Sequence, residues 1–141
     1  MNAVIFGGGK ISRGFLAQLL YRSGFHITFV ELDENLVRRL NEAGKYYVNV
    51  MGNPEESEWI ENYECIRLGD ISEIAGALKT ADIAFTSVGG KNLDALAGTI
   101  AAAFVQAEPE LKGRKFTIIT CENWKEPARQ LKEGILRELK S

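Results

Sequence analysis

Short apolar runs alternate with amphipathic segments along almost the whole chain. The apolar runs are rich in β-branched and aromatic residues and too short for helices, as is typical of buried strands. They cover residues 3–6, 27–30, 63–68, 81–88 and 115–120. Most segments between them repeat apolar residues every three or four positions, as one face of a helix does. This alternation predicts an α/β fold in which helices connect the strands of a parallel sheet.

The first amphipathic segment follows the first apolar run directly. Ile11, Phe15 and Leu19 recur at four-residue spacing, with Leu16 and Leu20 beside them. The spacing predicts a helix that buries this face against the sheet.

The later helices carry start and stop signals in the sequence. Asp33 or Glu34 is placed to cap the second helix, and Gly44 is placed to end it. The third helix is expected to be weak because Gly76 interrupts it. The fourth helix has the most regular apolar face, and we expect Pro109 to close it.

Residues 45–61 depart from the helical pattern. Tyr46, Val48 and Val50 alternate with residues of the opposite face, and Gly52-Asn53-Pro54 is a strong turn signal. These features predict an antiparallel β-hairpin inserted before the third parallel strand.

A glycine-rich turn links the first strand to the first helix. Gly7, Gly8 and Gly9 follow the apolar run 3–6, and this strand-to-helix context is typical of a dinucleotide-binding turn. There, glycine permits a tight turn and a close approach to a pyrophosphate, which the helix amides then face. Ser12 stands where the fingerprint has Gly or Ala, so we expect a looser helix-to-strand contact. The alternative is a plain junction whose glycines only make the turn.

A carboxylate ends the second strand. Glu31 follows Gly9 at close to the offset of about 20 residues expected for the acid that binds an adenosine ribose. Such a carboxylate accepts hydrogen bonds from ribose hydroxyls and repels a 2′-phosphate, and no Arg follows at 32–34 to reverse that preference. The pattern predicts NAD rather than NADP, although a solvated strand end would look the same.

The fourth strand ends in Ser87, Val88 and Gly89. Five parallel strands in the order 3-2-1-4-5 would make most of a Rossmann-type doubly wound sheet, in which ligands lie outside the carboxyl ends of the strands where the order reverses. We therefore expect this loop to face the cofactor beside the glycine turn. A full sheet of this type has a sixth strand, so we expect a fragment of a larger protein or a stand-alone half.

The composition fits one globular domain with no nucleic-acid or membrane partner. A formal net charge of −2 over 141 residues gives no basic surface for nucleic acid. No apolar run reaches the ~20 residues of a membrane span and no signal-peptide pattern opens the chain, so a cytoplasmic location is expected. Cys65 and Cys121 are expected to be reduced thiols in the core. With His26 as the single histidine, no metal site is expected.

Several blocks of the sequence resemble the polyol-specific long-chain dehydrogenases. The family's nucleotide motif reads G-A-G-N-I-G-R-G-F, and residues 7–15 read G-G-G-K-I-S-R-G-F. Val88-Gly89 and Cys121-Glu122-Asn123 match later blocks in the same order. The resemblance implies the amino-terminal NAD-binding domain of an enzyme that transfers hydride between a sugar-phosphate ketone and its polyol. The candidate cofactor-binding residues are Gly7, Gly8, Gly9, Lys10, Ile11, Ser12, Arg13, Gly14, Glu31, Ser87, Val88 and Gly89.

The resemblance also implies a catalytic role for Asn123. Near the nicotinamide, its amide would donate a hydrogen bond to the substrate oxygen and stabilise the alkoxide as hydride leaves. The alternative is that Asn123 caps a helix starting at Trp124. Glu122 could be a general base on spacing alone, but an acid at a strand end is usually solvated. The family's catalytic lysine belongs to a carboxyl-terminal domain, and nothing marks Lys91 or Lys125 as its substitute.

Two functions follow as hypotheses. In the first, this chain is half of a dehydrogenase, and a carboxyl-terminal domain in cis or on a partner chain supplies the pocket for a polyol or polyol phosphate. In the second, it is a stand-alone module that binds or senses NAD(H) without catalysis. A flavodoxin-like or S-adenosylmethionine-binding fold that uses the same glycine turn is a third possibility.

Overall fold

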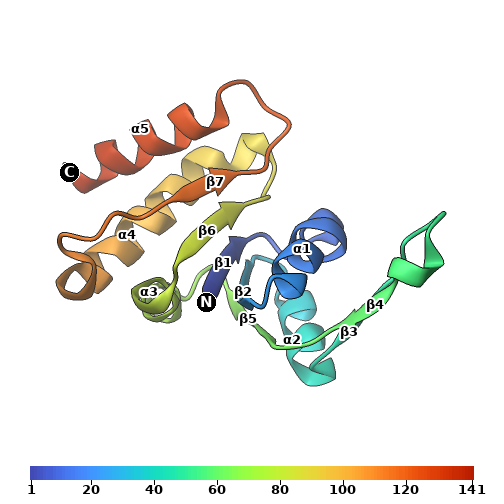
Figure 1. Ribbon diagram of the computed structural model, residues 1–141. Helices are drawn as coiled ribbons and strands as arrows, with labels where there is room; N and C mark the ends of the chain where they lie inside the picture. The colour runs from blue at the N-terminus through green and yellow to red at the C-terminus, as the bar shows by residue number, and fades with distance from the viewer.

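One parallel sheet organises the fold in the computed structural model, which describes residues 1–141 (Figure 1). The strands lie side by side in the order β5-β2-β1-β6-β7, and every neighbouring pair is parallel. This order confirms the predicted 3-2-1-4-5 arrangement, and it reverses direction at β1. The strands are β1 (Asn2–Phe6), β2 (His26–Glu31), β5 (Tyr63–Arg67), β6 (Ile83–Thr86) and β7 (Ile118–Thr120).

The central strand is buried on both faces, as a near-continuous apolar run predicts. Ile5 pairs with Phe29 on one side and with Phe85 on the other. Ile5 and Phe6 are both completely buried. This packing fixes the carboxyl end of β1, from which the glycine turn begins.

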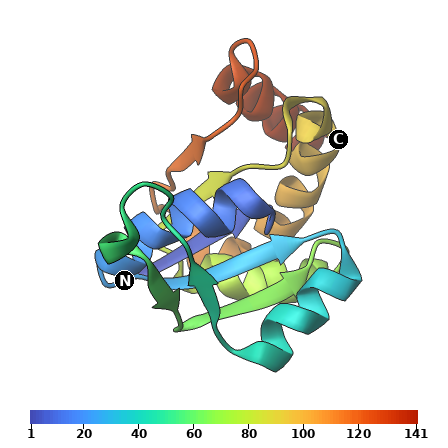
Figure 2. The same cartoon turned by 90° about the vertical axis from the view of Figure 1, so that its right-hand side faces the viewer.

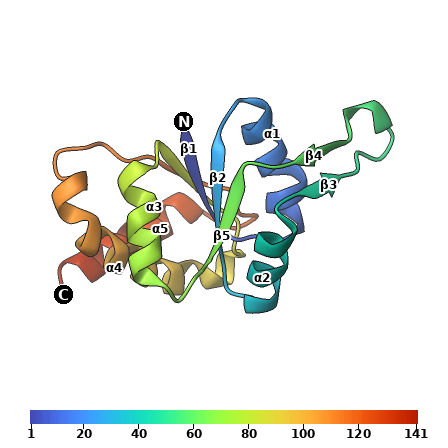
Figure 3. The same ribbon diagram turned by 90° about the horizontal axis from the view of Figure 1, so that it is seen from below.

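Helices cover both faces of the sheet (Figure 3). On one face, α1 (Ala17–Arg22) and α2 (Glu34–Ala43) pack against the cluster that contains Ile5 and Phe29. On the other face, α3 (Ile71–Thr80), α4 (Leu93–Leu111) and α5 (Pro127–Leu139) pack in the larger cluster around Phe6. No helix combines the length and the hydropathy that crossing a membrane requires.

The predicted ends of α2 are confirmed. The Asp33 Oδ1 accepts hydrogen bonds from the amides of Asn35 (3.0 Å) and Leu36 (3.3 Å), which is N-cap geometry. Gly44 ends the helix at a φ of 69°, a left-handed conformation that glycine adopts without a Cβ penalty. The β2–α2 turn, next to Glu31, is therefore held by local chemistry.

Two helices are longer than the sequence predicted. Gly76 does not interrupt α3, because the Asp70 cap and the burial of Ile74 and Leu78 outweigh a glycine cost of about 1 kcal/mol. Pro109 does not close α4, which continues to Leu111. A proline removes only one hydrogen bond in the last turn, and α4 is long enough to continue past it.

We expect Gly76→Ala to stabilise the protein by about 0.5–1 kcal/mol, because alanine loses less backbone entropy in a helix. A Cβ at Gly76 would meet no atom within 4 Å. At Gly134 of α5, by contrast, a Cβ would lie 2.8 Å from the Cβ of Ala97, so Gly134→Ala should destabilise the protein. Urea unfolding of both variants measures the difference, and a loss of stability in Gly76→Ala would contradict the prediction.

The first helix differs from its predicted packing. Leu16 and Leu20 are buried, but Ile11, Phe15 and Leu19 are 70%, 64% and 51% exposed, so the predicted buried face is wrong. A π-helical turn, η1 (Ser12–Leu16), precedes α1 and brings one extra residue into the turn that carries Phe15. The turn starts at the buried Ser12, where the fingerprint has a smaller residue.

The predicted hairpin is confirmed. Strands β3 (Tyr46–Val48) and β4 (Glu58–Ile60) pair antiparallel and project away from the main sheet, with the short helix η2 (Pro54–Glu56) between them (Figures 1 and 2). The Tyr46 hydroxyl donates to the carbonyl of Arg13 at 2.9 Å, and the Gln18 amide donates to the carbonyl of Glu56 at 3.0 Å. The hairpin therefore braces the helical segment that follows the glycine turn.

The two cysteines differ in environment. Cys65 lies in the core as predicted, whereas Cys121 is exposed, which corrects the expectation of a second core thiol. Cys121 follows β7, the last strand at one edge of the sheet. An edge position leaves such a residue fewer neighbours than its apolar sequence context indicates.

Candidate functional site

The glycine turn and the loop after β6 meet at the carboxyl edge of the sheet. Gly7 has a φ of 113°, and a Cβ there would lie 2.2 Å from the carbonyl oxygen of Ser87. The Gly7 amide donates to the carbonyl of Val30 at 2.7 Å, and the Ser87 amide donates to that of Phe6 at 2.8 Å. Only glycine fits this position, so the two loops are locked together by backbone contact.

The Glu31 carboxylate lies beside this turn. Its Oε1 accepts a hydrogen bond from the Gly8 amide at 2.9 Å, and its Oε2 accepts one from the Asp33 amide at 2.6 Å. Each carboxylate oxygen has a second lone pair, so Glu31 can also accept bonds from a ligand hydroxyl. Glu31 and the glycine turn, which the sequence names as candidate cofactor-binding residues, thus lie side by side in the fold.

A cavity of about 440 Å³ opens between these elements. Its size falls in the range of about 300–1,000 Å³ that small ligands and cofactors occupy. Apolar side chains from several strand ends and from α4 make its walls, and Glu31 is its one charged group. The lining residues are Gly7, Gly9, Val30, Glu31, Leu32, Leu68, Ser87, Val88, Asn92, Ala95, Leu96 and Thr99.

The first helical turn supplies free backbone donors next to the cavity. The helical conformation starts at Lys10, and the amides of a first helical turn have no acceptor within the helix. Arg13 is half-buried, and its Nε donates to the carbonyl of Gly8 at 2.8 Å. A positive side chain and unpaired amides at a helix start suit an anionic pyrophosphate.

The residues named from the sequence occupy different places in this site. Five of them line the cavity: Gly7, Gly9, Glu31, Ser87 and Val88. Gly8 is buried beneath Glu31, and Ser12 is buried in the turn behind it. Lys10, Ile11 and Gly14 are exposed on the helix start and do not line the cavity, and neither do Arg13 and Gly89.

The sequence reasoning missed part of the cavity wall. Leu32 and Leu68 each follow a strand end, so the rule that ligands lie outside the carboxyl ends could have found them. Leu96 on the apolar face of α4 is both a buried core residue and part of the cavity wall. Ala95 and Thr99 carry no signal in the sequence that separates them from ordinary helix positions.

Two expectations about the residues after β7 are wrong: the capping role of Asn123 and the solvation of Glu122. Asn123 is exposed, and α5 starts at Pro127 after Glu126, so Asn123 does not cap a helix starting at Trp124. Glu122 is not freely solvated, because its Oε2 accepts from the Val88 amide and its Oε1 from the Gly89 amide, both at 3.0 Å. This acid binds the loop that lines the cavity.

Two protonated side chains, Cys65 and Tyr46, pack in the cluster that contains Ile5 and Phe29. Burial raises the pKa of the Cys65 thiol to about 12, with a further increase from Glu31 and an opposing effect of Arg13. Burial also raises the pKa of Tyr46, whose hydroxyl donates to the Arg13 carbonyl. Cys65 is therefore a thiol at neutral pH rather than a nucleophile or ligand. No group of three or more acidic, histidine or cysteine side chains is arranged to hold a metal ion.

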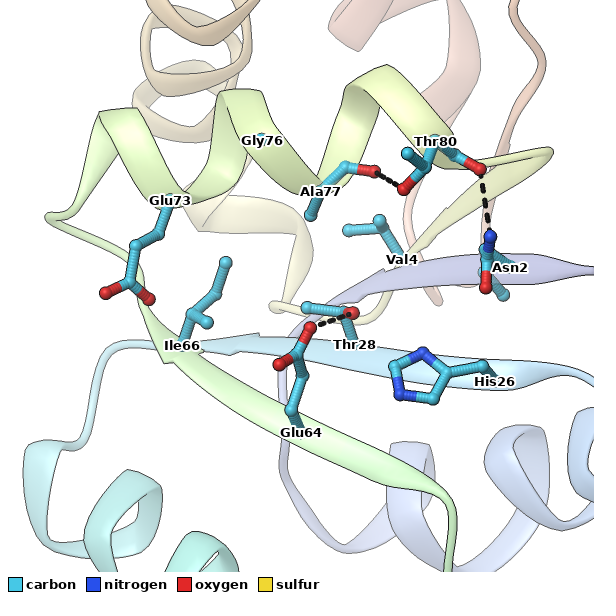
Figure 4. Close-up of a pocket in the computed structure, with 11 residues that line it drawn as sticks. Asn2, Val4, His26, Thr28, Glu64, Ile66, Glu73, Gly76, Ala77 and Thr80 are labelled. Carbon is cyan, nitrogen blue, oxygen red and sulfur yellow. Dashed lines mark hydrogen bonds between the residues drawn. The ribbon is translucent and has the colours of Figure 1, made fainter.

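A second cavity of about 420 Å³ lies between the sheet and α3 (Figure 4). Its lining includes Asn2 and His26, the first residues of β1 and β2, and Thr80, the last residue of α3. The imidazole of His26 is half-buried, and the Thr28 hydroxyl donates to Glu64 at 3.2 Å. This cavity lies toward the amino ends of the strands, away from the glycine turn.

The geometry of the carboxyl edge agrees with the comparison with known families. The model of the mannitol dehydrogenase Rossmann domain matches residues 1–141, the whole chain. The chain belongs to this family. Within the mannitol dehydrogenase Rossmann domain, the glycine turn, Glu31 and the loop after β6 occupy one edge of the sheet, as described above.

The curated relatives are longer enzymes. Mannitol-1-phosphate 5-dehydrogenase from Brevibacillus brevis is 37% identical over 139 residues, which cover 99% of this chain and 36% of that protein. The enzyme of the same name from Shouchella clausii is 36% identical over 140 residues, with 99% and 37% covered. The chain thus spans a little over a third of these relatives and matches their amino-terminal part.

Solved structures share the fold at low sequence identity. Glycerol-3-phosphate dehydrogenase from Coxiella burnetii superposes with a TM-score of 0.61 at 15% identity, covering 99% of this chain and 38% of that one. D-Mandelate dehydrogenase, solved with NADH and anilino(oxo)acetate, gives 0.64 at 15% identity, with 96% and 38% covered. These likenesses establish a Rossmann-type sheet for the mannitol dehydrogenase domain.

Proposed function

We propose that this chain is the NAD(H)-binding domain of an oxidoreductase like mannitol-1-phosphate 5-dehydrogenase. The observation that carries the proposal is the Glu31 carboxylate, which lines a cavity of about 440 Å³ and accepts a hydrogen bond from the Gly8 amide at 2.9 Å. The residues present fit a dinucleotide. Gly9 leaves open space for close approach, and the start of the helix offers unpaired amides.

Glu31 favours NAD over NADP in this proposal. A ribose with two free hydroxyls can donate to the carboxylate, whereas a 2′-phosphate would bring a second negative charge against it. No Arg or Lys lies at 32–34 to compensate. The apolar walls from Leu32, Leu68 and Val88 would then hold the adenine.

In the proposed reaction NAD(H) would supply the hydride chemistry when bound, and the residues of this chain would hold and orient it against the substrate. Asn123 would donate a hydrogen bond to the substrate oxygen from the end of β7 and so stabilise the developing alkoxide. A lysine base would come from a carboxyl-terminal domain, in cis or on a partner chain. The substrate would be a sugar-phosphate ketone and its polyol.

A second domain would also account for the exposed apolar stripe formed by Ile11, Phe15 and Leu19. The stripe starts at the glycine turn, so a domain that closes over the cofactor would reach it. The relatives carry nearly two thirds of their length outside the matched region, which is enough chain for such a domain.

Calorimetric titration of the chain with NADH and NADPH, and with S-adenosylmethionine as the control ligand, tests this function. Without a closing domain we expect weak binding of NADH, with a Kd on the order of 10 µM to 1 mM, and several-fold weaker binding of NADPH. No binding of either nicotinamide cofactor at millimolar concentration would contradict the proposal. Binding of the control ligand alone would indicate a methyltransferase-like site.

A further inference from the structure

The Glu122 carboxylate is hydrogen-bonded to the loop that follows β6, residues 87–89. Each of its two carboxylate oxygens accepts one hydrogen bond at 3.0 Å, Oε2 from the Val88 amide and Oε1 from the Gly89 amide. The side chain is half-buried, and hydrogen bonds to an ionised acceptor are about twice as strong as neutral ones. Two consecutive amides of the loop are thus fixed from the neighbouring strand end.

The gripped loop is a wall of the nucleotide cavity. Val88 lines the cavity directly, and the Ser87 carbonyl stands where a Cβ of Gly7 would otherwise be. Gly89 turns the chain at a φ of 89° before α4 begins. A shift of this loop would therefore move the cavity wall and open the contact with the glycine turn.

The hydrogen bonds to Glu122 also affect which backbone amides are available to donate to a phosphate. The Val88 and Gly89 amides precede the start of α4 and, without a partner, would be donors for an anion. Glu122 occupies both of them and places a negative charge there. Glu122 thereby removes these two amides as donors for a pyrophosphate, whereas the amides at the start of the helix that begins at Lys10 remain available.

Trp124, two residues after Glu122, makes a second contact with the chain at the end of this loop. The ring of Trp124 packs against Gly90, where a Cβ would lie 2.0 Å from the ring. The Trp124 indole donates to Gln130 at 2.9 Å, and the Gln130 amide donates to Asp94 of α4 at 3.0 Å. The segment 122–124 therefore contacts the loop at Val88 and Gly89 through Glu122, and the residue that follows it, Gly90, through Trp124.

We propose that Glu122 is a positioning residue for the cofactor, because its carboxylate holds the loop 87–89 against the glycine turn. This role rests on the proposed NAD(H)-binding function and goes beyond it. Glu122 acts through the loop and does not itself contact the cofactor. The role of a strand-end general base, which spacing alone allowed, is replaced by this one.

The test compares Glu122→Gln with Glu126→Gln in the full chain. Glu126 lies in the same segment, is exposed and has a single ionic contact, with Arg129 at 3.4 Å, so it is the matched control. In Glu122→Gln one amide hydrogen of the new side chain faces a backbone N–H, and we expect NADH to bind about tenfold more weakly. Glu126→Gln should bind NADH like the parent.

Amide hydrogen exchange by NMR separates positioning from a general loss of stability. In Glu122→Gln the amides of Val88 and Gly89 should exchange about tenfold faster or more, while the Gly8 amide, held by Glu31, keeps its rate. Glu122→Asp retains the charge but is one methylene shorter. It should recover part of the affinity and the protection of one amide, and it provides the test if Glu122→Gln does not fold.

Three outcomes would overturn the proposal. The first is parental NADH affinity in Glu122→Gln, and the second is faster exchange spread evenly over the core instead of confined to the loop. The third is a parent chain that binds neither NADH nor ADP-ribose, which would refute the proposed function itself and with it the role of Glu122. The first two outcomes leave the proposed function intact.

Discussion

Gly7→Ala is expected to abolish NADH binding and to destabilise the chain by about 3 kcal/mol or more. Its φ of 113° costs an alanine about 1–2 kcal/mol, and the new Cβ would lie 2.2 Å from the Ser87 carbonyl oxygen. That oxygen belongs to backbone that is tied to Phe6, so it cannot move away without breaking the β1–β6 connection. Overpacking of this kind adds about 1–3 kcal/mol.

Gly9→Ala separates the contribution of the glycine turn to stability from its contribution to cofactor binding. A Cβ at Gly9 would meet no atom of the protein within 4 Å, so the variant should unfold like the parent. Gly9 lines the cavity, and a methyl group there would occupy space that we assign to the pyrophosphate. We expect a large loss of NADH affinity with little change in unfolding.

Gly14→Ala is the matched control for both variants. Gly14 is exposed, and a Cβ there would also meet nothing within 4 Å, but it lies outside the cavity. In urea unfolding Gly9→Ala should therefore resemble Gly14→Ala, with only Gly7→Ala destabilised, whereas in NADH titration Gly7→Ala and Gly9→Ala should both lose affinity and Gly14→Ala should not. A Gly7→Ala variant as stable as Gly14→Ala, or a Gly9→Ala variant that binds NADH normally, would contradict these assignments.

The strands and their order follow from local pattern, which is why the sequence predicts them well. Each strand is a short apolar run bounded by turn residues, and parallel connections are right-handed, which leaves few arrangements of five strands. The glycine turn and Glu31 can be recognised in the sequence because they are separated by close to the offset of about 20 residues that a dinucleotide fingerprint has. Their meeting at one edge of the sheet was predictable because β1 and β2 are neighbours and parallel.

The exposed stripe on the first helix could not be predicted from periodicity. Four-residue spacing identifies a face but not what covers it, and the π-helical turn from Ser12 to Leu16 rotates that face away from the sheet. Within this turn the Arg13 carbonyl accepts a hydrogen bond from the Tyr46 hydroxyl, which belongs to a hairpin far along the chain. A contact of this kind leaves no regular pattern in the sequence.

The grip of Glu122 on Val88 and Gly89 was hidden for a similar reason. The partners are backbone amides, which every residue carries, so no residue type marks them in the sequence. A carboxylate at a strand end has the same appearance whether it is solvated or bonded. The neighbouring strands β6 and β7 must be placed side by side before the contact can be seen.

Glu31→Gln is expected to reduce the preference of the chain for NADH over NADPH. The substitution keeps the size of the side chain but removes its charge and one acceptor, so ribose hydroxyls lose a charged partner worth about 1.5–3 kcal/mol. NADH should then bind about tenfold more weakly or worse. NADPH should bind as well as before or better, because its 2′-phosphate no longer meets a carboxylate.

Glu34→Gln provides the control, since Glu34 is exposed at the start of α2 and its ionic contact is with Arg67 at 3.6 Å. The same change of charge three residues away should leave both affinities as they are. Loss of the Glu31 charge also leaves one of the Gly8 and Asp33 amides poorly bonded, at a cost of about 1 kcal/mol in unfolding. A uniform loss for both cofactors would mean that Glu31 only supports the turn, whereas a change confined to their ratio would mean that it selects the ribose.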